Sequence, residues 1–213
     1  MSGDEKGLLV EMPVRGFLDE LASASPAPGG GSVAALAGAI AAALTLMVSR
    51  LTIGREKFRA QEETMRGALG RAEDLRHRLL ALVDKDTEAF LRVISAYRMP
   101  KGTDAEKRAR AQAVQRAVVA ATEVPLEVAA LSLEALEMAA VALEHGNPNT
   151  ASDAGVAFLM ALAGARGASL NVRINLDSID DEVAREKLRH RLDKVLAQVD
   201  EFESKISRIL KSL

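Results

Sequence analysis

The chain has 213 residues, a mass of 22.7 kDa and a formal net charge of −2 at pH 7, which allow one domain with a substantial hydrophobic core. This charge, together with 3% aromatic residues and no Trp, argues against a nucleic acid partner. The lack of Cys excludes disulfides, thiolate metal sites and cysteine nucleophiles.

The N-terminus has no basic segment followed by an apolar one, so we expect no signal peptide. The uncharged run 33–48 has 16 residues and is mostly Ala, whereas a membrane span needs roughly 20 residues of stronger hydrophobicity. We therefore expect a cytoplasmic protein with no membrane partner.

Apolar residues recur at helical spacing nearly everywhere, and no stretch alternates convincingly as a strand does. Pro13 suits the first turn of a short helix that ends before Pro28. A second helix is predicted from the glycines after Pro28 to about Arg50. It is apolar on all its faces, which is typical of a buried helix.

The stretch 58–97 carries one long helical pattern with apolar positions at steps of three and four. The pattern fails between Val83 and Phe90, where Asp86 stands. A buried carboxylate is costly unless it is hydrogen-bonded or charge-paired. Asp86 is therefore either a structural residue that fixes the helix register, a rim residue of a slightly rotated helix, or a functional acid.

Thr103 and Glu106 predict a capping box at the start of the next helix, which Pro125 should kink or restart. Beyond it, Gly146 suits a left-handed helix C-cap. Four glutamates follow one stripe of this helix and are expected to be its solvated edge: Glu127, Glu134, Glu137 and Glu144.

Thr150 and Asp153 predict a capping box for a helix whose uncharged part, 154–165, indicates a second buried helix. Asn171 and Asn175 then share one helix face, where their amides either read a polar heterocycle or satisfy backbone carbonyls. Ser178 and Asp181 predict the cap of a last helix. Its apolar seam, which packs within this subunit or on a second one, comprises Leu188, Leu192, Val195, Val199, Phe202, Ile206, Ile209 and Leu213.

These patterns predict an all-α fold: a single-domain bundle of long, partly kinked helices with buried Ala-rich helices. We expect 1–12 to be a flexible N-terminus and 13–213 to be the helical domain.

The segment 25–32 reads SPAPGGGS. Its prolines stop the preceding helix, and its glycines leave the first N–H groups of the next helix open to a ligand, where the helix dipole favours an anion. A linker or a tight turn between close helices explains the same composition. No Gly-Lys-Ser/Thr follows and no strand precedes, so it is neither a Walker loop nor a dinucleotide fingerprint.

His77, His145 and His190 lie far apart without ligand spacing, so we expect no metal site. The remaining chemistry is a metal-free site of loop N–H groups, amides, one buried carboxylate and basic side chains. Such a site suits proton transfer around a small polar substrate.

The chain resembles the cyclodeaminase/cyclohydrolase family, the domain found at the C-terminal end of formiminotransferase-cyclodeaminase and as free-standing bacterial proteins. The resemblance runs from about residue 17 to 175, and it is most specific in the first motif. The matching segments are 17–23 with 25–36, then 86–90, 146–149 with 152–157, and 171–175.

The resemblance implies an all-helical homodimer, with no cofactor beyond a tetrahydrofolate substrate. It implies cyclisation of 5-formiminotetrahydrofolate to 5,10-methenyltetrahydrofolate with release of ammonia, an ammonia-lyase reaction. The nearest alternative is hydrolysis of the methenyl bridge to 10-formyltetrahydrofolate, and the alternative of another class is a non-catalytic folate-binding helical dimer. For the lyase reaction, we expect a separate formiminotransferase as the partner that supplies the substrate.

With this resemblance we expect Asp86 to be catalytic, orienting the pterin or relaying protons, with a pKa raised by burial. We also expect it to share a cleft with the glycine loop. The substrate's polar edge is expected at Pro28, Gly29, Gly30, Gly31, Ser32, Asn147, Asn149 and Asp153. Asn171 and Asn175 are expected to bind the amide groups of the pterin ring. The glutamate tail of the substrate is expected to bind Arg55, Lys57 or Lys101.

Overall fold

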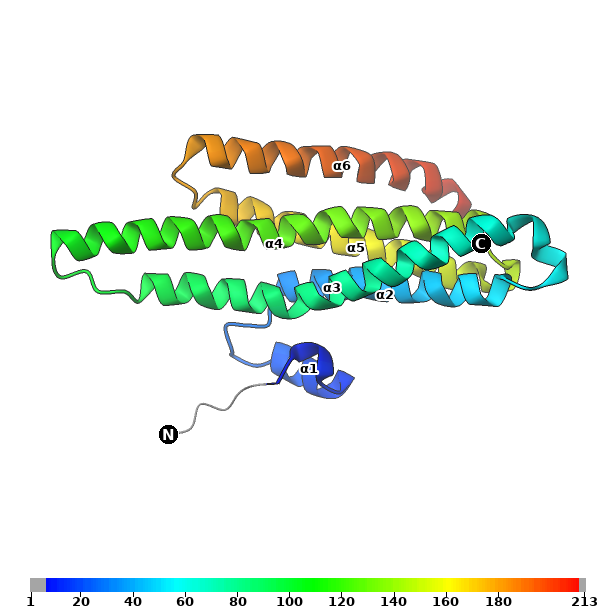
Figure 1. Cartoon of the computed structure of the whole chain (residues 1–213), viewed down its shortest axis with the longest axis horizontal. Helices are drawn as coiled ribbons and strands as arrows, with labels where there is room; N and C mark the ends of the chain where they lie inside the picture. Colours follow the sequence, from blue (N-terminus) through cyan, green and yellow to red (C-terminus); the bar gives the residue numbers. More distant parts are fainter. Residues whose placement is uncertain (1–6, 211–213) are drawn as a thin grey trace.

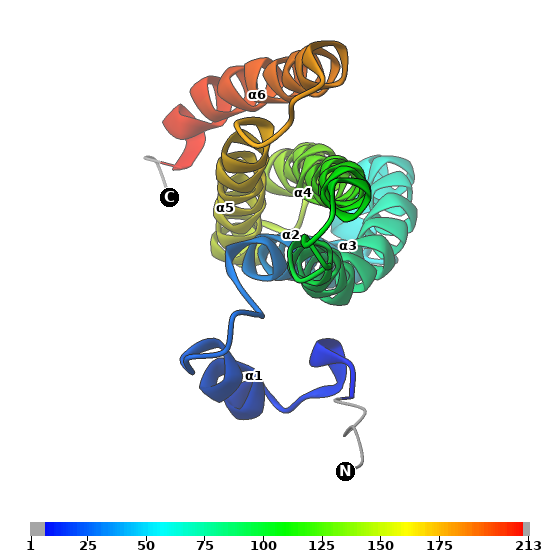
Figure 2. The ribbon, with the colours of Figure 1, turned by 90° about the vertical axis from the view of Figure 1, so that its left-hand side faces the viewer.

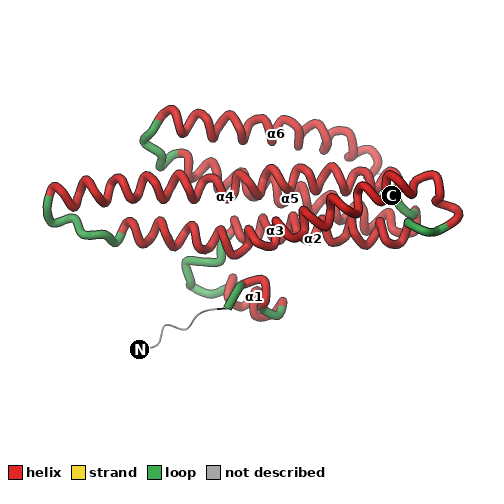
Figure 3. Tube along the Cα trace, viewed as in Figure 1, coloured by secondary structure: helices red, strands yellow, loops and turns green. Residues whose placement is uncertain are grey.

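The computed structural model describes residues 7–210, which contain helices and no strand, so the predicted all-α class is confirmed (Figure 3). The α-helices are α1 (Val14–Leu21), α2 (Gly30–Thr52), α3 (Glu62–Tyr97), α4 (Asp104–His145), α5 (Ala151–Leu176) and α6 (Glu182–Leu210). Short 3-10 helices cover Leu9–Glu11, Glu56–Gln61 and Pro148–Thr150.

Helices α2 to α5 form an antiparallel bundle, and α6 lies along its outside against α4 and α5 (Figures 1 and 2). Helix α1 stands outside the bundle near the start of α2 (Figure 2). Helix α2 begins near the middle of α3 and α4, which continue past it as a hairpin (Figure 1). The space beyond the first turn of α2 is therefore bounded by three other helices.

Small residues let α2, α4 and α5 cross closely. A Cβ atom built on Gly38 of α2, or on Gly164 of α5, would lie 2.7 Å from Ser132 Oγ of α4. This spacing is closer than non-bonded carbon and oxygen atoms tolerate, so the crossing depends on glycine at both positions. The buried Ala-rich helices are thus confirmed as the centre of the bundle.

One face of these two helices is nevertheless open, which corrects the prediction of burial all round. On α2 the exposed residues include Ile40 and Met47, with exposed fractions of 39% and 37%. On α5 Leu159 and Ile174 are exposed by 53% and 70%. By length and composition Gly30–Thr52 and Pro148–Leu176 could each cross a membrane, but 67% and 50% of their most apolar windows lie buried inside the protein, as in core helices generally.

Pro125 does not restart α4, which runs without a break to His145. Proline cannot donate the helical hydrogen bond to the carbonyl of Ala121, four residues earlier. The side-chain Nδ2 of Asn175 on α5 donates to that oxygen instead, at 3.2 Å. A contact between α4 and α5 therefore replaces the backbone N–H that Pro125 lacks, which is the lack that predicted a break in the helix.

The capping box of Thr103 and Glu106 is confirmed, with the Glu106 N–H 3.2 Å from Thr103 Oγ1. The left-handed cap at Gly146 is wrong, because its φ is −73°. A Cβ atom there would lie 2.6 Å from Val48 Cγ1, so close packing explains this glycine. The predicted box at Thr150 is also wrong, since its hydroxyl donates to Asn147 O.

The cap of α6 is Asp181 rather than Ser178, since its carboxylate accepts the N–H groups of Val183 and Ala184 at 2.9 and 3.1 Å. The α6 seam packs within this subunit, with Leu192 and Ile206 buried in the two main core clusters. The predicted seam positions 209 and 213 lie outside the residues whose side chains are described.

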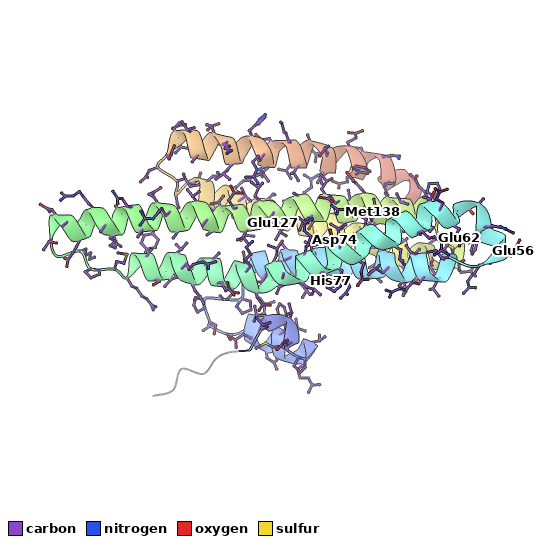
Figure 4. All side chains as sticks on the ribbon, viewed as in Figure 1. Glu56, Glu62, Asp74, His77, Glu127 and Met138 are labelled. Carbon is purple, nitrogen blue, oxygen red and sulfur yellow. The ribbon has the colours of Figure 1, made fainter. Side chains whose placement is uncertain are left out.

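The glutamate stripe of α4 is not simply a solvated edge. Glu127 lies 3.4 Å from Lys85 of α3, and Glu134 forms an ion pair with Arg71, which is also on α3. Figure 4 labels Glu127 on α4 and Asp74 on α3 along the seam between the two helices. These two glutamates face the basic side of α3, which the sequence does not place beside them, whereas Glu144 lies 3.4 Å from Lys205 of α6.

The structure describes residues 7–12 of the N-terminal segment and leaves 1–6 outside the described range, so the flexibility expected of 1–12 stays a prediction. Leu9 donates its N–H to Asp84 Oδ1 of α3 at 2.6 Å, and its side chain packs on the core with that of Met12. The segment thus lies against α3 at Asp84, two residues before Asp86.

Candidate functional site

A cleft of 280 Å³ opens where α2 begins, between α3, α4 and α5. It exists because α2 starts only at this level, while its three neighbours continue past it (Figure 1). Gly30 and Asp86 both line it, so the expectation that the glycine loop and this acid share a cleft is met. The lining residues are Pro26, Ala27, Gly29, Gly30, Gly31, Asp86, Phe90, Val93, Tyr97, Val118, Ala121, Pro125, Asn171, Asn175 and Ser178.

Asp86 is half-buried and held by the first turn of α2. Its Oδ2 lies 3.2 Å from Ser32 Oγ, and the backbone of Ser32 also bonds to the carboxylate. Burial raises the pKa of Asp86, while the Ser32 hydrogen bonds oppose that rise. An acid held near a helix N-terminus with a raised pKa can exchange protons with a bound ligand.

The glycines at the start of α2 give Asp86 its place. A Cβ atom on Gly31 would overlap the Asp86 carboxylate, and one on Gly30 would lie 3.7 Å from the amide of Asn171. Only a residue without a side chain at position 31 lets the acid reach the first turn of α2. The loop composition therefore reflects close helix packing as well as exposed N–H groups.

Asn171 and Asn175 line the opposite wall on α5. Their Nδ2 groups donate to Gly167 O at 3.1 Å and to Ala121 O at 3.2 Å. Within residues 7–210 neither Oδ1 atom has a hydrogen-bond donor, so both can accept from a ligand. Both interpretations of this pair therefore apply. Each side-chain NH2 group satisfies a backbone carbonyl, and each side-chain carbonyl oxygen is free to accept a hydrogen bond from a ligand.

Phe90, Val93 and Tyr97 form an apolar wall one to three helical turns beyond Asp86 on α3. Phe90 and Tyr97 are exposed by 39% and 47%, a large fraction for aromatic side chains. The cleft therefore has a polar end at Asp86 and an aromatic end at Tyr97.

The structure does not bring every predicted residue to this cleft. Ser32 is buried behind Gly31, and Pro28 lines a neighbouring cavity against the N-terminal segment. Lys101 is exposed in the α3–α4 turn. The remaining five predicted residues lie near the other end of α2, about 33 Å away along a helix of this length: Arg55, Lys57, Asn147, Asn149 and Asp153.

Asn147 is occupied by structural bonds at that far end. Its N–H donates to Thr52 Oγ1 at 2.8 Å, its Nδ2 to Leu51 O at 3.3 Å, and its Oδ1 accepts from the Asn149 N–H at 3.1 Å. These bonds fasten the α4–α5 connection to the C-terminus of α2. Asn149 is exposed and Asp153 is half-buried nearby.

Several lining residues were not singled out as site residues from the sequence. Phe90, Val93 and Tyr97 fall on the apolar positions of the helical pattern in 58–97, which indicates a core, although their spacing from Asp86 also indicates that they share its face of the helix. Val118 and Ala121 carry no such signal, because only the packing of α4 brings them to the cleft.

The histidines lie elsewhere. His77 is on α3 with its Nε2 3.1 Å from Glu73 Oε1 (Figure 4). Among residues 7–210 no group of three or more His, Asp or Glu side chains is placed to hold a metal ion.

A concave site with apolar walls, one acid of raised pKa and a few convergent amides is typical of a protein that acts on a small molecule. Residues 13–194 match the family model described as formiminotransferase-cyclodeaminase. The chain therefore belongs to this family.

Two of the relatives that cover nearly all of the chain show the range of the family. A methenyltetrahydrofolate cyclohydrolase from Methylorubrum extorquens is 43% identical over 92% of this chain and 94% of its own length. The formimidoyltransferase-cyclodeaminase of Mus musculus is 38% identical over 100% of this chain, which spans only 38% of that longer protein.

A solved structure has the same fold. The crystal structure of formiminotetrahydrofolate cyclodeaminase from Thermotoga maritima aligns with a TM-score of 0.85 at 30% identity, covering 95% of this chain and 97% of that one.

Proposed function

We propose that this chain is a folate one-carbon enzyme that acts, in the cleft beside Asp86, on the carbon bound between N5 and N10 of tetrahydrofolate. The observation that carries this assignment is the acid of raised pKa, held by Ser32, opposite two free amide oxygens. The amide oxygens suit the N–H donors of a reduced pterin, and the acid suits proton transfer at its nitrogens.

In the hydrolytic reaction, water adds to the methenyl carbon and Asp86 takes the proton that this water loses. The carbon–N5 bond then breaks as N5 gains a proton, which leaves a formyl group on N10. In the cyclising reaction, N10 attacks the formimino carbon and Asp86 carries a proton to the departing nitrogen, which leaves as ammonia. Both reactions need one group that accepts a proton and returns it.

We place hydrolysis first, because a relative matched over 94% of its own length carries the name methenyltetrahydrofolate cyclohydrolase. Cyclisation with release of ammonia is the second candidate, favoured by the cyclodeaminase of similar fold. A separate formiminotransferase is needed as a supplier only in the second case.

The test is to mix purified protein with each substrate and follow methenyl absorbance, which falls during hydrolysis and rises during cyclisation. We expect Asp86→Asn to lower kcat by about 100-fold or more with a smaller change in KM. Glu88→Gln, an exposed acid on the same helix, should retain full activity. Near-normal turnover by Asp86→Asn would remove this acid from the mechanism. Binding without absorbance change by the wild type would indicate a folate carrier.

We also infer that the chain forms a homodimer through the exposed apolar face of α2 and α5. Adjacent exposed apolar residues of this kind mark protein interaction surfaces. A two-fold axis across the middle of α2 would set the Asn149 and Asp153 end of one chain beside the Gly30 end of the other. In that dimer both predicted groups of binding residues serve one site.

We further propose that the protein is cytoplasmic and has neither a nucleic acid nor a membrane as a partner.

A further inference from the structure

Arg110 of α4 is not itself a lining residue of the cleft, but it is held against Tyr97, the lining residue at the aromatic end. Its Nε donates to the backbone oxygen of Tyr97 at 3.0 Å, and its guanidinium carbon lies 5.5 Å from the centre of the Tyr97 ring. Among residues 7–210 no carboxylate lies within 4.0 Å of it. One of its five N–H donors is used by Tyr97, and the other four are free for a ligand.

Helix geometry places this guanidinium in line with the cleft. Arg110 precedes the lining residue Ala121 by eleven residues, which is three helical turns, so both lie on the same face of α4. On α3, Asp86 and Tyr97 are also eleven residues apart, a rise of about 16 Å. The order along the cleft is therefore acid, Phe90, Tyr97 and then the guanidinium.

We propose that Tyr97 and Arg110 form the subsite for the p-aminobenzoyl-glutamate end of the folate, with the aryl ring against Phe90 and Tyr97 and a glutamate carboxylate on the Arg110 guanidinium. This proposal rests on the proposed function, which puts the pterin beside Asp86. A reduced folate has the same linear order: a polar bicyclic ring, an aryl ring and a carboxylate.

Arg110 suits this role better than the basic residues expected from the sequence. Lys101 is exposed in the turn beyond Tyr97. Arg55 and Lys57 lie at the far end of α2, so they would approach this cleft only from the partner subunit of the proposed dimer, whereas Arg110 is held at Tyr97 within the same chain. Because Tyr97 already fixes the guanidinium, binding a carboxylate orders it little further, and its planar fork can bind both carboxylate oxygens.

The test compares the substrate that the wild type turns over with its tetrahydropteroate counterpart, which lacks the glutamate. We expect Arg110→Met to raise KM for the folate about tenfold or more with kcat unchanged, as for loss of a hydrogen bond to a charged group. With the pteroate, wild type and variant should have equal KM. Tyr97→Leu should raise KM for both substrates, because both contain the aryl ring. Arg108→Met, an exposed arginine two residues away, is the matched control.

Equal KM values of wild type and Arg110→Met for the folate would overturn the subsite, and so would the same increase with both substrates. Turnover of neither substrate by the wild type would instead remove the proposed function. The subsite is then tested separately by calorimetry with p-aminobenzoylglutamate. Binding that Arg110→Met loses and Arg108→Met keeps would support it, and no binding to the wild type would overturn it.

Discussion

Asp86 and Gly31 depend on each other, because a single Cβ atom at position 31 would occupy the space of the carboxylate. We expect Gly31→Ala to push Asp86 away from Ser32 and lower kcat at least tenfold, although the helix should persist. Gly70→Ala is the matched control, since a Cβ atom there meets nothing within 4 Å. That control should keep full activity and gain roughly 0.5–1 kcal/mol of stability. Unchanged kcat in Gly31→Ala, measured in the absorbance assay, would contradict this geometry.

The raised pKa of Asp86 also predicts how stability depends on pH. The folded protein binds this proton more tightly than the unfolded chain, so the contribution of Asp86 is fully present below the unfolded-state pKa and is lost as pH rises through the folded-state pKa. At neutral pH the ionised, partly desolvated group costs stability. Asp86→Asn should therefore melt about 2 °C higher than wild type there, a difference that shrinks toward pH 4. Melting curves between pH 4 and 8 measure it, and a difference that does not vary with pH would refute it.

At the scale of elements, α4 and α5 are coupled through the carbonyl that Pro125 leaves without a helical donor. Asn175→Leu leaves Ala121 O without the Nδ2 donor at 3.2 Å, and should lower the free energy of unfolding by about 1–3 kcal/mol. Restoring a backbone N–H with Pro125→Ala should recover much of this loss in the double variant. Urea unfolding of the single and double variants measures the coupling. Additive effects would show that Asn175 does not serve this carbonyl.

The open face of α2 and α5 is a property of the whole molecule, because residues far apart in sequence form it together. Sedimentation equilibrium should show a dimer for the wild type and monomers for Leu159→Lys with Ile174→Lys, since two buried charges on an isologous interface are repeated in both copies. Val183→Lys changes a residue of α6 exposed by 79% and should leave the dimer intact. A monomeric wild type at micromolar concentration would contradict the proposed interface.

The sequence by itself determined the class of fold, most helix boundaries and the unusual position of Asp86, because helical periodicity and glycine or proline punctuation are local properties. It also linked the glycine loop with Asp86 in one cleft. Tertiary structure decided what depends on contacts between helices. The continuation of α4 through Pro125 needs a donor from α5, and the close approach at Gly146 depends on Val48. The separation of Asn147 from Asn171 follows from how α5 packs along the length of α2, and the place of Arg110 beside Tyr97 follows from the pairing of α3 with α4. Both are relations between helices, which periodicity within one helix does not contain.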